Sequence, residues 1–263
     1  MTIYELMIKT NHYLIKDGEL TDAQKENIVR QILSAKSDER TKQNFHKTMG
    51  GALYPLYFIP PYNGGKKLQT VIPMSPKTHI LSANAYELEI IRLLALFAPD
   101  NPEVKDMVKE TLKRLKLSCP GNDCAIGECF HSSLPVLRFL AVAAPENTAW
   151  INKLVRKFNK HINEKLKTKG CHGNVLWYYW LCLSELPFEI AEPEIIKYKD
   201  RILNQLNRSS VMNGENDKIN HPVMICAIRN CLCRLPEYAY IKNRQPYVSE
   251  KDGRLYFDVN PII

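Results

Sequence analysis

Residues 127–147 read GECFHSSLPVLRFLAVAAPEN, and variants of this stretch recur along the chain. The stretch joins a loop rich in metal-capable side chains to an apolar helical run that stops at Pro145. Three other apolar runs stop in the same way, at Pro99, Pro187 and Pro236, so that successive stops are 46, 42 and 49 residues apart. A period near 45 residues is typical of solenoids built from two-helix repeats.

The four runs before these prolines differ from the segments that follow the first three. The runs 83–98, 132–144, 174–186 and 222–235 are apolar on nearly all sides, whereas the segments 102–117, 147–167 and 193–207 are amphipathic. A helix that is apolar on all sides is buried, and a helix with one apolar face lies outside. We therefore expect an all-α fold of α/α helical hairpins, arranged as a superhelix or an open toroid.

The two ends of the chain predict additions to these hairpins. Residues 1–49 have the pattern of two or three amphipathic helices, one of which opens with the capping box Thr21-Asp22-Ala23-Gln24. Residues 50–78 are rich in proline, glycine and apolar side chains, which predicts an irregular segment packed on the body. Asp252-Gly253 lies between β-formers and predicts a small β-hairpin with a type I′ turn.

These patterns predict one globular unit with three parts. The parts are an N-terminal region at 1–78, the α/α hairpins at 79–240 and the hairpin appendage at 241–263.

Composition and charge restrict the class of protein. The chain has 263 residues, of which 45% are hydrophobic and 24% charged, as in ordinary soluble domains. The sequence contains neither an apolar run long enough to cross a membrane nor a secretory signal pattern at its start. We therefore expect a cytoplasmic protein whose eight cysteines are thiols or ligands. The net charge of +8 permits an anionic partner.

Histidines and cysteines gather near the starts of the apolar runs. His131, His172 and His221 precede their prolines by 14, 15 and 15 residues, and Cys129 and Cys171 stand beside two of them. If the buried helices run parallel, these side chains share one rim of the fold. Three or four nitrogen and sulfur ligands at such a rim would suit Zn²⁺.

Acid–base chemistry at this rim would need further groups. Glu128 is the nearby carboxylate, and Glu128, His131 and His221 are the candidate catalytic residues. The alternative interpretation remains open, because histidines near helix starts often cap helices and cysteines usually pack in cores. The loop cysteines Cys119 and Cys124 have a five-residue spacing that differs from that of common zinc sites, so they carry little information.

The stretch Gly170-Cys171-His172-Gly173-Asn174 leads into an apolar run and resembles the Cys-His-Gly zinc motif of lanthionine cyclases. That family has a second zinc cysteine some tens of residues earlier, and here Cys129 stands 42 residues before Cys171. The resemblance covers about residues 127–186. It implies an α/α-toroid in which Cys129, Cys171 and His172 bind Zn²⁺ and leave the fourth position open.

Three classes of function stay open at this point. The first is a zinc-assisted enzyme that acts on a peptide or small molecule at the rim of the inner helices. The second is a non-catalytic helical-repeat scaffold that binds a peptide or protein. The third, which we do not favour, is a nucleic-acid-binding solenoid that uses the basic side chains from Lys153 to Lys169.

Overall fold

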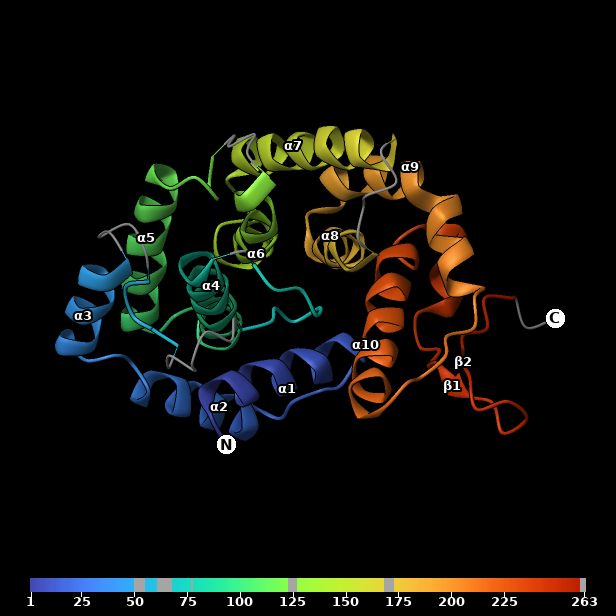
Figure 1. Cartoon of the computed structure of the whole chain (residues 1–263), viewed down its shortest axis with the longest axis horizontal. Helices are drawn as coiled ribbons and strands as arrows, with labels where there is room; N and C mark the ends of the chain where they lie inside the picture. The colour runs from blue at the N-terminus through green and yellow to red at the C-terminus, as the bar shows by residue number, and fades with distance from the viewer. Residues whose placement is uncertain (50–54, 61–67, 77, 123–126, 168–172, 261–263) are drawn as a thin grey trace. The chain divides into compact units, whose positions relative to one another are not determined.

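A computed structural model of the chain describes residues 1–49, 55–60, 68–76, 78–122, 127–167 and 173–260 (Figure 1). Within these ranges the fold is all-α with one small C-terminal hairpin, as the sequence predicts. The helices α1 to α10 are Ile3–Ile15, Asp22–Ser34, Glu39–Met49, His79–Phe97, Pro102–Leu117, Gly127–Ala143, Thr148–Lys167, Gly173–Glu185, Phe188–Leu206 and Glu215–Leu232. The 3-10 helix η1 (Pro236–Ile241) and strands β1 (Tyr247–Val248) and β2 (Leu255–Tyr256) follow. No helix in these ranges combines the length and apolar character needed to span a bilayer.

The chain divides into two compact units. Unit 1 comprises residues 1–11 and 20–171, and unit 2 comprises residues 12–19 and 172–263. In unit 1, α4 packs against α2, α5 and α6, and α6 packs against α7. In unit 2, α8, α9 and α10 pack against one another, and η1 packs on α10.

Burial in unit 1 follows the predicted contrast between apolar and amphipathic helices. Every residue of α4 from Leu81 to Leu94 is buried, whereas α5 buries a single face. That face is made of Val104, Met107, Thr111, Arg114 and Leu115, which recur at helical spacing. The described part of the irregular segment also packs on the body, since Phe58, Val71 and Ile72 are at most 2% exposed.

Local signals account for the helix ends that the sequence predicts well. The Asn101 side chain accepts hydrogen bonds from the backbone N–H groups of Glu103 and Val104, and Pro102 takes the first helical position of α5. α5 therefore has the predicted bounds. The capping box of Thr21 and Gln24 at the start of α2 is also confirmed.

Two local predictions are wrong. The amphipathic helix predicted at 193–207 begins earlier, because α9 begins at Phe188 and contains Pro193. The apolar face continues N-terminally through the buried Ala191, and this burial offsets the hydrogen bond that the proline cannot make. The C-terminal hairpin forms, but its turn is not type I′, because only Gly253 has a positive φ (67°). The Asp252 carboxylate instead accepts from Arg254 N and Tyr256 Oη and holds a longer turn.

Candidate functional site

The predicted rim residues are described to different extents. Cys171 and His172 lie outside the described residues, and Glu128 lies in α6 but its side chain is not described. Cys129 and His131 are half-buried in the first turns of α6, in unit 1. In unit 2, His221 lies on α10 with Nε2 3.7 Å from Asp217 Oδ1.

The two described donors of α6 do not point toward one ion. Residues two positions apart on a helix project from different faces, so Cys129 and His131 diverge. The Phe130 ring between them packs instead on His161 of α7, with ring centroids 4.0 Å apart. Among the described residues, no three His, Cys, Asp or Glu side chains are grouped closely enough to hold a metal. A zinc site that includes Cys171 and His172 stays a prediction.

The structure reveals a set of buried charges in α4 that sequence reasoning missed. Glu87, Glu89 and Arg92 are 0%, 1% and 4% exposed. Glu89 Oε2 accepts a hydrogen bond from Arg138 Nη1 of α6 at 2.6 Å. Arg92 Nη1 donates to Asn11 Oδ1 at 3.3 Å. A usable signal was present, because charges in a helix without a polar face must be buried and therefore paired.

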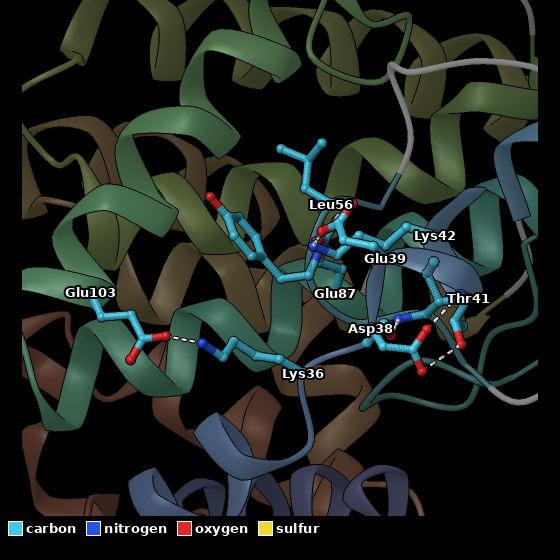
Figure 2. A network of polar contacts seen from close by, with 11 residues as sticks. Lys36, Asp38, Glu39, Thr41, Lys42, Leu56, Glu87 and Glu103 are labelled. Atoms are coloured by element: carbon cyan, nitrogen blue, oxygen red, sulfur yellow. Dashed lines mark hydrogen bonds and ion pairs between the residues drawn. The ribbon is translucent and has the colours of Figure 1, made fainter.

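Glu87 links three segments of unit 1. Its Oε2 accepts from Arg114 Nη2 of α5 at 3.0 Å. Its Oε1 accepts from the backbone N–H groups of Leu56 and Tyr57 at 2.8 and 2.7 Å, and Figure 2 shows Glu87 beside Leu56. Arg114 Nη1 also donates to Asn84 Oδ1 at 2.6 Å. Burial lowers the pKa of Arg114, and the neighbouring Glu87 carboxylate opposes this effect. The network thus holds α5 and the 55–60 segment on α4.

The exposed half of α5 is divided by charge. At 100° per residue its acidic and basic side chains occupy two adjacent arcs of about 60° and about 80°. The acidic arc holds Glu103, Asp106 and Glu110, and the basic arc holds Lys105, Lys109, Lys113 and Lys116.

The acidic arc of α5 faces other parts of unit 1. Glu103 forms an ion pair with Lys36, from the connection between α2 and α3 (Figure 2). The pKa of Tyr57 is raised by burial and then by the charges of Glu110, Glu87 and Asp106, so the acidic arc lies near this ring.

A groove lies along the other side of α5, against the C-terminal ends of α4 and α6. Its volume is about 390 Å³. The floor is apolar and half-buried, and the four lysines of the basic arc line one edge. The floor includes Val108 and Leu112 of α5, Ala95 of α4, and Val142 and Ala143 of α6.

Unit 2 has a larger hollow, of about 500 Å³, where α1, α8 and α10 end. Its polar side chains hold helix ends. Arg234 Nη1 donates to the carbonyls of Leu183 and Leu186 at 2.7 and 2.6 Å, and Arg229 Nη2 lies 2.5 Å from Asp17 Oδ2. Burial raises the pKa of the Cys233 thiol, which disfavours the nucleophilic thiolate. The polar side chains around this hollow therefore stabilise the ends of the helices.

Comparisons with known proteins find no similar protein. No protein-family model matches the sequence, and no curated protein and no solved structure is significantly similar to it. The resemblance to lanthionine cyclases stays a prediction. Function must therefore be inferred from the geometry of the described residues.

Proposed function

We propose that the chain is a non-catalytic helical scaffold that binds a peptide or protein partner. The observation that carries this proposal is the groove on unit 1. Val108, Leu112 and Val142 are half-buried on its floor, and lysines line its edge. An apolar groove with a charged edge has the form of a surface that accepts an amphipathic peptide.

The buried carboxylates of α4 support a scaffold over an enzyme. A general acid or base must come within hydrogen-bond reach of its substrate. Both oxygens of Glu87 are engaged by Arg114 and by two backbone amides, and Glu89 is 1% exposed and paired with Arg138. These carboxylates therefore connect helices and stabilise the fold.

Selection from peptide libraries on the purified full chain tests the proposal. One library should favour helices and another extended segments, with peptides of about 16 residues. We expect enriched peptides to bind with a Kd of about 100 µM or tighter by fluorescence anisotropy, and scrambled versions of the same composition to bind more weakly. Failure of every enriched peptide to bind better than its scrambled version would overturn the scaffold proposal.

The zinc-assisted enzyme is the competing proposal, and metal content separates the two. We expect protein purified without chelator to contain less than about a tenth of an equivalent of zinc. About one equivalent of zinc, lost in a folded Cys171→Ala or His172→Ala variant, would favour the enzyme.

A further inference from the structure

We propose that the groove on unit 1 binds an acidic amphipathic helix of a partner protein. The apolar side of that helix would lie on the floor, and its carboxylates would meet the lysines of α5. This inference rests on the proposed scaffold function and names the chemistry of the partner.

The spacing of the groove residues fits a helix of about three turns. Val104, Val108 and Leu112 line the groove at one residue per turn of α5, and the lysines run beside them from Lys105 to Lys116. That row rises by about 17 Å along the helix axis. A partner helix of about eleven residues has the same length. One apolar residue per turn on the partner would match the apolar stripe of α5.

The two edges of the groove differ, and this difference sets the pattern of the partner. One edge carries the lysines, whereas the side of the groove toward α4 and α6 is lined only by apolar residues, among them Ala95, Pro99 and Val142. A helix seated there would meet cations along one flank only. We therefore expect carboxylates on one flank of its apolar stripe, since carboxylates on the other flank would lose water without gaining a charged partner.

The chain's own carboxylates leave the lysine row largely uncompensated. Lys109 and Lys116 form no ion pair with any described residue. Lys105 pairs with Asp100, and Lys113 with Glu110, but these pairs are exposed and contribute little. Because Glu103 is engaged by Lys36 on the other side of α5, the groove side presents net positive charge. Such a surface attracts an acidic segment and repels a basic one.

A designed peptide probes the inference on the full chain. The peptide has about 16 residues, with leucines at one-turn spacing and glutamates along one flank. One matched peptide carries lysines in place of the glutamates, and another carries serines in place of the leucines. We expect the acidic peptide to bind, and each matched peptide to bind at least about tenfold more weakly. Binding of the acidic peptide should also weaken when salt is raised from about 0.05 to about 0.5 M.

The protein variant for this test is Lys109→Glu/Lys116→Glu. We expect it to weaken binding of the acidic peptide by at least about tenfold. Lys160→Glu, at an exposed position of α7, is the matched control and should leave binding unchanged within about twofold. Circular dichroism and thermal melting check that both variants fold. If Lys109→Glu/Lys116→Glu does not fold, Lys109→Gln/Lys116→Gln replaces it. We expect this second variant to lose less affinity for the acidic peptide.

The outcomes separate this inference from the proposed function. If library-selected peptides bind the wild-type chain and a folded lysine variant equally well, the groove inference is overturned and the scaffold function stands. If no peptide binds specifically, both proposals fail. The matched peptide with serines in place of leucines could bind as tightly as the acidic peptide, and a single-stranded oligonucleotide could compete with both. The groove would then be a general polyanion surface. That result would overturn the inference in favour of nucleic-acid binding.

Discussion

The helices α4 and α8 are both buried in their units, but their interiors are built differently. α4 buries Glu87 and Glu89, each paired with an arginine of a neighbouring helix. α8 buries Tyr178, Tyr179 and Trp180, all 0% exposed. A buried ion pair needs one particular partner at one position, whereas a ring fills a volume that other apolar groups can also fill in part. We therefore expect α4 to depend on matched charges and α8 on shape.

The strongest test of this comparison is Arg138→Met. It leaves the Glu89 carboxylate in the core of unit 1 without its arginine, and we expect a loss of about 3–5 kcal/mol in the free energy of unfolding. Urea denaturation measures the loss. The double variant Glu89→Leu/Arg138→Met is the control, and it should recover most of the stability because it removes both charges. If Arg138→Met alone lowered the free energy of unfolding by less than about 1 kcal/mol, the stability of α4 would not depend on matched charges.

The corresponding substitution in α8 is Trp180→Phe. Trp180 Nε1 is buried without a hydrogen-bond partner among the described residues, so the change removes ring volume and no bond. We expect a loss of about 1–3 kcal/mol from the cavity that remains. Trp180→Ala in the same denaturation series should cost more, in proportion to the larger cavity. If the two variants were equally destabilised, shape would not be the deciding property of α8.

Alkaline pH should weaken the interior of unit 2, to which α8 belongs. Burial raises the pKa of Cys226, on α10, from 9.0 to about 11. The pKa of Cys226 is higher in the folded chain than in the unfolded chain, so its contribution to the free energy of unfolding is fully present below pH 9.0. As the pH rises from 9.0 to about 11, the free energy of unfolding falls by about 2 kcal/mol. Denaturation at about pH 8 and about pH 11 should show a smaller pH-dependent loss in Cys226→Ala than in the wild-type chain.

The smallest expected effect concerns an aromatic residue within α4 itself. Tyr86 is 7% exposed, and burial raises its pKa to about 12. Tyr86→Phe keeps the ring and removes only the hydroxyl, so we expect a change below about 1 kcal/mol at neutral pH. A thermal melt compares this variant with Arg138→Met. A loss as large as that of Arg138→Met would mean that the charges of α4 are not its special feature.

The glycine at position 121 shows how much of a local structure can be hidden from sequence reasoning. In the sequence it is one of several residues in a cysteine-containing loop. In the structure a Cβ at this position would lie 2.1 Å from the Leu115 carbonyl oxygen, and Trp150 Nε1 donates to the Gly121 carbonyl at 2.6 Å. The need for glycine arises from the close approach of the chain to the end of α5. No local signal predicts such an approach.

The sequence alone determined the elements whose causes are local. Apolar periodicity predicts the buried α4 and the one-sided α5, and Asn101 with Pro102 sets where α5 begins, because caps satisfy backbone groups within a few residues. Local signals are less reliable where burial competes with them. α9 runs through Pro193 for this reason, and the C-terminal turn departs from type I′ because Asp252 bonds to later residues.

Only the tertiary structure decided which distant groups meet. Glu89 pairs with Arg138, which is 49 residues away, and Glu87 meets both Arg114 and the backbone at Leu56 and Tyr57. The groove likewise needs α4, α5 and α6 together, although its lysine row is already visible in the helical spacing of α5. Helical periodicity orders the side chains of one helix, but it carries no information on which helix packs against which face. That choice depends on the packing and charge pairing of the whole unit.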